Sequence, residues 1–175
     1  MKKIHRKQNP VMTAAKLLLI ASAAVYPLFM TMLTGIGILS KSDSYGSKIT
    51  FCGAALVLSG ASLTAAAILC LFRKSLPNLL SMCIALPSFA VCMISLFLLV
   101  SHAESAGWTG HGFYSAVPVA DMYRQRILPV ILPFMLTITI AAVQYFSSSA
   151  AEERREFRRR KEAEKNAPAP KIINS

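Results

Sequence analysis

The feature that most constrains this chain is a set of four long apolar runs that contain no Asp, Glu, Lys, Arg or His. The runs cover Leu17 to Leu39, Ile49 to Phe72, Leu79 to Val100 and Ile127 to Phe146. Each has the roughly 20 residues that an α-helix needs to cross about 30 Å of hydrocarbon. A charge at the bilayer centre costs about 2.5–3.5 kcal/mol on insertion scales, so charge-free runs are expected to insert. The pattern predicts an all-α integral membrane protein, a bundle of four transmembrane helices.

Composition supports one membrane domain and little else. With 54% hydrophobic and 15% charged residues in 175, the chain is too apolar for an ordinary soluble domain. We expect a basic N-terminus over residues 1–16, a transmembrane domain over 17–146 with an external loop at 101–126, and a charged tail over 147–175. The four cysteines lie inside apolar runs and form no C-x-x-C, so neither a disulfide framework nor a zinc site is predicted.

The first run has a competing interpretation. Basic residues followed by an apolar stretch with Ala21-Ser22-Ala23 are also typical of a cleavable signal peptide. Cleavage there leaves only Leu17 to Ile20 as an unbroken apolar core, and the run continues far beyond the site. We therefore expect an uncleaved signal anchor.

The basic residues are distributed asymmetrically around the runs. Fifteen of the 19 Lys and Arg residues lie before the first run, between the second and third runs, or after the fourth, and four lie on the other side. The positive-inside rule then places both termini in the cytoplasm. The lysine-rich start and tight connections favour a bacterial cytoplasmic membrane. The net charge of +11 is not gathered on an aromatic-bearing domain, so anionic headgroups of the cytoplasmic leaflet are the expected partners, and nucleic acid is disfavoured.

Small residues predict where the second and third helices pack. Membrane helices associate where small side chains let backbones approach. A hairpin turning near Ser75 would place Ser59 opposite Cys92 and Ala66 opposite Ala85. The predicted packing seam, spaced by alternating steps of four and three, consists of Ala55, Ser59, Ser62, Ala66, Ser81, Ala85, Ser88, Cys92 and Ser95. Leu56 and Leu63 are expected to form a bulky ridge facing away from it, and the second helix is expected to be the most enclosed.

After the fourth run, the sequence predicts a polar cytoplasmic helix that extends helix four to about residue 165, started by a capping box at Ser149 and Glu152. The proline-containing end that follows is expected to be disordered. One basic cluster stands out in this tail: Arg158, Arg159, Arg160 and Lys161. It serves as a topology anchor or as a contact for anionic lipid or a partner protein.

Function is predicted mainly by exclusion. Ion-coupled transport usually needs an ionisable residue within a membrane helix, and intramembrane proteolysis needs a catalytic set at that depth; the runs contain neither. The external loop holds His102, Glu104, His111 and Asp121, which lack ligand spacing, so no metal or cofactor is predicted. We expect a non-enzymatic subunit that packs against other membrane proteins or itself.

The alternative is an oligomeric channel or passive transporter. Its path would be lined by uncharged polar side chains from the first and fourth helices. The candidates are Thr31, Thr34, Thr137, Thr139 and Gln144.

Overall fold

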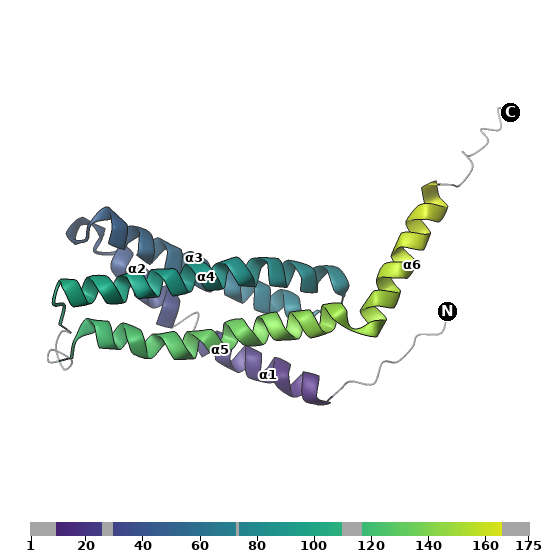
Figure 1. Ribbon diagram of the computed structural model, residues 1–175, viewed down its shortest axis with the longest axis horizontal. Coiled ribbons are helices and arrows are strands. Elements are labelled where there is room, and N and C mark those ends of the chain that lie inside the picture. The colour runs from purple at the N-terminus through teal and green to yellow at the C-terminus, as the bar shows by residue number, and fades with distance from the viewer. Residues whose placement is uncertain (1–9, 26–29, 73, 110–116, 166–175) are drawn as a thin grey trace, which may run out of the picture.

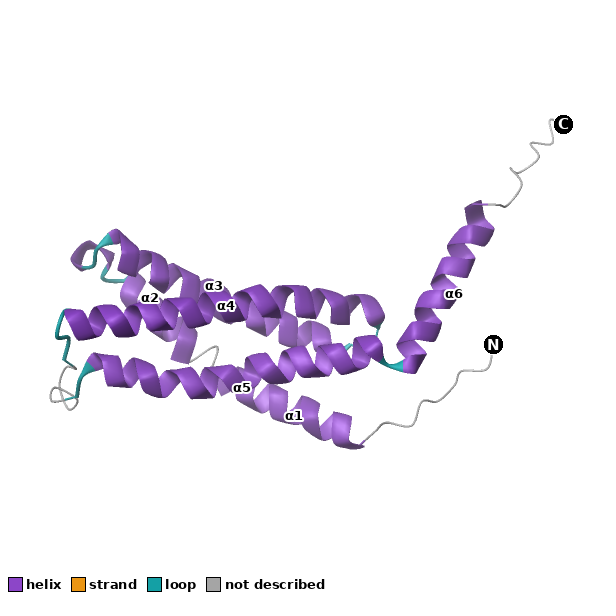
Figure 2. Ribbon diagram, viewed as in Figure 1, coloured by secondary structure: helices purple, strands orange, loops and turns teal. Residues whose placement is uncertain are grey.

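A computed structural model describes residues 10–25, 30–72, 74–109 and 117–165, and every regular element in this part of the chain is a helix (Figures 1 and 2). An isolated antiparallel bridge joins Thr109 to Pro118. The all-α prediction is therefore confirmed. The helices are α1 (Pro10–Val25), α2 (Leu33–Leu39), the 3-10 helix η2 (Ser42–Ser44), α3 (Ser47–Leu71), α4 (Ser75–Ser105), α5 (Val119–Phe146) and α6 (Ser148–Lys165).

Three of these helices, α3, α4 and α5, are long and apolar enough to cross a membrane. They lie side by side along the long axis of the molecule, with α4 between α3 and α5 in sequence and antiparallel to both (Figure 1). Helix α3 is the most enclosed, as expected, because 44% of its most apolar 18-residue window is buried, against 33% in α4 and in α5. Large apolar side chains such as Phe51, Leu98 and Leu128 remain exposed, as lipid-facing residues do.

The first apolar run differs from the expected single helix. It is divided between α1 and α2, with a π-helical turn at residues 30–32 immediately before α2. Pro27, the proline of this run, lies outside the described residues. Helix α1 packs near the α6 end of α3, and α2 packs on the opposite half of α3 (Figure 1). Between them, α1 and α2 follow α3 from one end to the other.

The helices extend beyond the charge-free runs. Helix α1 begins at Pro10, so Lys16 belongs to the helix rather than to an N-terminal segment. Helix α4 continues to Ser105 and α5 begins at Val119, so both helices reach into the segment 101–126. A charge-free run marks the part of a helix that lies in hydrocarbon, whereas backbone hydrogen bonding continues into the interface, where polar side chains are solvated.

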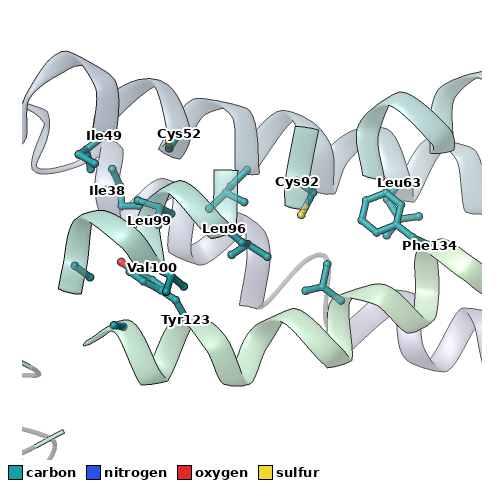
Figure 3. Close-up of a cluster of buried hydrophobic side chains, with 14 residues drawn as sticks. Ile38, Ile49, Cys52, Leu63, Cys92, Leu96, Leu99, Val100, Tyr123 and Phe134 are labelled. Atoms are coloured by element: carbon teal, nitrogen blue, oxygen red, sulfur yellow. The ribbon is translucent and has the colours of Figure 1, made fainter. Parts of the chain in front are cut away.

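The core consists of two clusters along the bundle. The larger one joins α2, α3, α4 and α5 and includes Leu56, Leu63, Cys92, Leu96 and Phe134 (Figure 3). The smaller cluster, nearer to α6, joins α1, α3 and α5 and includes Leu19, Cys70 and Ala141. The whole length of the α3–α4–α5 bundle is thus packed by apolar side chains.

Helix α6 is a separate helix, not a straight extension of α5. Ser147 has an extended ψ of 146°, and beyond it α6 leaves the bundle at an angle (Figure 1). The Ser147 hydroxyl donates to Gln144 O at 3.0 Å, and Ala151 N donates to Ser147 O at 3.1 Å. The helix boundary therefore falls at Ser147, two residues before the predicted capping box.

Candidate functional site

The predicted packing seam is mostly buried. Ser62 and Ser88 are half-buried, and both helices contribute to the fully buried members. Those are Ala55, Ser59, Ala66, Ser81, Ala85, Cys92 and Ser95. Several of the hydroxyls turn back onto their own helix: Ser59 donates to Ala55 O at 2.7 Å and Ser88 to Ile84 O at 2.7 Å. These hydroxyls donate to carbonyls of their own helix, so they do not line a polar path through the bundle.

One seam hydroxyl crosses between the helices. Ser81 Oγ donates to Ala66 O at 2.7 Å in a buried setting. This contact joins the Ser81 side chain of α4 to the backbone of α3 at Ala66, so the two helices of the predicted seam touch here. The facing pairs of the predicted register, such as Ala66 with Ala85, stay a prediction.

Leu56 and Leu63 do not form a ridge facing away from α4. Both are almost completely buried, and they share a core cluster with Cys92 and Leu96 of α4 (Figure 3). In the bundle α3 is covered by α1, α2, α4 and α5, so small and large side chains are both enclosed.

The face of α3 that carries Gly53 meets α2 at very close range. A Cβ added at Gly35 of α2 would lie 2.5 Å from Gly53 O and 2.7 Å from Val57 Cγ2. A Cβ added at Gly53 would lie 2.8 Å from Ile38 Cγ2. Only glycine permits this close approach. In a membrane, where no hydrophobic effect drives helices together, such close van der Waals contact stabilises the helix pair.

A buried polar cluster that the sequence reasoning missed lies where α3 ends. We call it the polar clasp: Lys16 of α1, Asn78 of α4 and Gln144 of α5. Lys16 Nζ donates to Leu71 O at 3.0 Å, placing a cation at the negative C-terminal end of α3. The Gln144 amide, oriented by its neighbours, accepts from Lys16 Nζ at 3.0 Å and donates to Phe72 O at 3.1 Å.

Asn78 completes the clasp from the first turn of α4. It is fully buried, and its Nδ2 donates to Lys74 O at 2.8 Å and to Phe72 O at 3.2 Å. Among the described residues its Oδ1 has no hydrogen-bond partner. The clasp therefore supplies donors to carbonyls that the end of α3 and the tight turn leave open. Gln144 is the sole amide side chain inside the four apolar runs, and that signal could have pointed to it.

At the opposite end of the bundle, polar and aromatic residues surround an open groove of about 700 Å³ between α2, the turn after it, residues 107–109 and α5. Trp108 is one of its lining residues, and its ring centroid lies 5.2 Å from that of Tyr45 and 5.0 Å from that of His102. Trp108 is also fixed through its backbone, which donates to Ala103 O and accepts from Val119 N, both at 3.0 Å. The aromatic residues form a belt of the kind found at membrane surfaces.

Two arginines near this groove have different surroundings. Arg124 pairs with Glu104 and, at 2.7 Å, with Asp121, and all three side chains are about half exposed. Arg126 is half-buried, lies 5.7 Å from the Tyr123 ring centroid and donates to the Thr34 hydroxyl. Within the described residues Arg126 has no carboxylate partner.

The loop residues considered as metal ligands do not assemble. Glu104 and Asp121 are engaged by Arg124, and His102 packs edge-on against Trp108. His111 lies outside the described residues. Among the described residues no three His, Cys, Asp or Glu side chains gather in a way that could hold a metal ion.

The basic cluster of the tail lies on α6 and is exposed at all four positions, Arg158, Arg159, Arg160 and Lys161. Lys161 Nζ lies 5.4 Å from the Phe157 ring centroid. The charges of this cluster are available to a membrane surface or a partner protein.

Comparison of the chain with protein-family models, with characterised proteins and with solved structures finds no match.

Proposed function

We propose that this protein is a non-enzymatic membrane subunit that packs against the transmembrane helix of another protein, or of a second copy, through the exposed face of α3. The observation that carries the proposal is a row of exposed residues on α3 at alternating steps of three and four. The row consists of Phe51, Ala54, Leu58, Ala61, Ala65, Ile68 and Phe72. This is the heptad spacing by which helices pack at a shallow angle.

The exposed row of α5 provides the contrast. It consists of Leu128, Leu132, Met135, Thr139, Val143 and Phe146 and contains no alanine or glycine. Bulky side chains are solvated well by lipid tails, whereas a row with three alanines lets a neighbouring helix approach closely. In α3 the spacing of Ala61 and Ala65 is the small-xxx-small pattern, and both side chains point away from the protein's own bundle.

The topology that accompanies this proposal has four crossings, with both ends in the cytoplasm of a bacterial cell. Lys16 contacts the last residue of α3, and Ile38 lies against Gly53 in its first half, which supports a first crossing made jointly by α1 and α2. The basic asymmetry supports the orientation. Impermeant thiol reagent added outside cells should label Ser42→Cys and spare Glu162→Cys, each in a Cys83→Ala background, because Cys83 is the exposed native cysteine. Labelling of position 162 from outside would overturn the orientation.

The channel alternative is less well supported. Thr137 Oγ1 donates to Pro133 O at 2.7 Å, Thr34 donates to Met30 O, and Gln144 is held in the polar clasp. Thr139 is exposed on the outer face of α5. Side chains engaged in these ways are poor candidates for lining a path through the bundle.

The experiment that tests the proposed function is copurification of tagged protein from native membranes in mild detergent. Ala61→Leu and Ala65→Leu together should remove the partner or the self-association, since they add bulk only at the exposed face. Ala90→Leu, an equally exposed alanine of α4, is the matched control and should leave the complex intact. An unchanged complex in the α3 variant would refute the proposed face. A pure homo-oligomer that conducts solute in liposomes would favour the channel instead.

A further inference from the structure

We propose that the groove around Trp108 holds one phospholipid, with its phosphate group on Arg126 and Lys41 and its acyl chain along α2 and α5. This inference goes beyond the proposed subunit function and concerns a different face of the molecule. It rests on three properties of the groove: uncompensated positive charge, a graded polar-to-apolar lining, and a position at the end of the apolar helices.

The positive charge comes first. Arg126 and Lys41 both line the groove, and within the described part of the chain neither forms an ion pair. Arg124, only two residues from Arg126, takes both nearby carboxylates, Glu104 and Asp121. A guanidinium has five N–H donors in a planar fork suited to phosphate. Among the described residues, the Arg126 guanidinium donates to one acceptor, the Thr34 hydroxyl. Its other N–H donors therefore remain for an anion.

The lining changes character across the groove. Its polar part contains Thr34, Ser40 and Thr109 beside the two cations, and its apolar part contains Leu33, Val119 and Met122. A free inorganic anion would not contact the apolar part, and a neutral hydrocarbon would not pair with the cations. An amphiphile with a phosphate head matches both.

The position of the groove agrees with this ligand. Arg126 immediately precedes the charge-free stretch of α5 that begins at Ile127, so its side chain lies at the boundary of the apolar region. Tyr45, Trp108 and Tyr123 line the same groove, and tyrosine and tryptophan favour the headgroup level. The inference holds for either orientation of the protein, because both leaflets supply phospholipids.

Trp108 gives a direct readout, because it is the single tryptophan of the chain and lines the groove. The protein is reconstituted into vesicles in which phosphatidylglycerol or, in parallel, phosphatidylcholine carries brominated acyl chains that quench tryptophan on contact. We expect the anionic lipid to quench Trp108 at lower mole fractions than the zwitterionic lipid. At about 1 kcal/mol for each near-surface basic residue, Arg126→Gln should reduce that preference about fivefold.

Two further variants make the result decisive. Lys48→Gln removes a positive charge from an exposed residue at the same end of the bundle but outside the groove lining, and it should retain the preference. Lys41→Gln changes an exposed residue, so it should fold normally and lower the preference in the same direction as Arg126→Gln. If Arg126→Gln fails to fold, Lys41→Gln carries the test.

Three outcomes would overturn the proposal. Equal quenching by the two lipids in the unmodified protein would show that the groove does not select a headgroup charge. Equal loss of preference in Lys48→Gln and in the groove variants would reduce the effect to general surface charge. Inorganic phosphate that displaces the brominated lipid and shifts Trp108 emission by itself would identify a soluble phosphate compound, rather than a lipid, as the ligand.

Discussion

The two ends of the bundle are held together by opposite means. At the α6 end, the polar clasp directs polar side chains from α1, α4 and α5 onto backbone carbonyls at the end of α3. At the other end, α2 meets α3 through bare backbone at Gly35 and Gly53, and aromatic rings surround an open groove. The comparison shows that polar groups at the α6 end serve the fold, whereas several at the groove end remain available for a ligand.

The largest effect is expected at the glycine contact. In Gly35→Leu the new side chain has no space, since even its Cβ would lie 2.5 Å from Gly53 O. We expect α2 to separate from α3 and the free energy of unfolding to fall by about 3 kcal/mol or more, because backbone atoms cannot yield as a flexible side chain does. Denaturation in mixed detergent micelles measures the loss.

Gly37→Leu is the matched control for this prediction. It lies on the same short helix, and nothing stands within 4 Å of an added Cβ. The control should be neutral or slightly stabilising, since leucine is a better helix former than glycine. Equal destabilisation by the two variants would show that the close approach of α2 to α3 does not stabilise the fold.

A smaller loss is expected at the polar clasp. Asn78→Leu keeps the approximate volume of the side chain but removes the donor that serves Phe72 O and Lys74 O. We expect a loss of about 1 kcal/mol, the net value of a typical hydrogen bond, because Phe72 O keeps the Gln144 amide as a donor and the unpartnered Oδ1 also disappears. The same micelle denaturation applies, with Gln125→Leu at an exposed position of α5 as the control. If both variants lost the same stability, the clasp would have no special role.

At the groove end, the ion pairs of Arg124 should contribute little. Its side chain and those of Glu104 and Asp121 are each about half exposed, so solvent and salt screen their attraction. We expect Arg124→Gln to change the unfolding free energy by less than about 1 kcal/mol. A double-mutant cycle with Glu104→Gln isolates the pair, and a coupling energy well above that value would show that this end is also held by charge.

The smallest effect on the fold is expected in the tail. Replacing Arg158, Arg159, Arg160 and Lys161 with Gln should leave the topology unchanged, because basic residues before α1 and between α3 and α4 still mark the cytoplasmic side. Thiol labelling at positions 42 and 162 checks this. Affinity for anionic vesicles should fall if the cluster contacts lipid, and salt should weaken that affinity in the unmodified protein. If vesicle affinity depended neither on salt nor on the four basic residues, the tail cluster would not bind anionic lipid.

The sequence predicted some parts of this molecule well and others poorly. The absence of charged residues located the helices α3, α4 and α5, because the charge of each residue is known from the sequence alone. It could not locate the polar clasp, because Lys16 and Gln144 are 128 positions apart and are joined only when α1 and α5 both pack near the end of α3. It also missed the role of Gly35, because a glycine that permits close contact reads the same as one in open space, such as Gly37.

The sequence by itself determined that this protein has helices apolar enough for a membrane, that it is all-helical, and where its small residues lie along the helices. Hydrophobicity and spacing are properties of the chain, so they can be read without the fold. Only the tertiary structure decided that the first apolar run is divided between two helices, that the Ser81 hydroxyl donates across to Ala66 O, and that Arg124 is paired while Arg126 has no ion pair among the described residues. Each of these depends on which groups from distant parts of the chain lie within a few ångströms of one another. Lipid solvates all helices alike, so that choice is made by the fit of one helix against another.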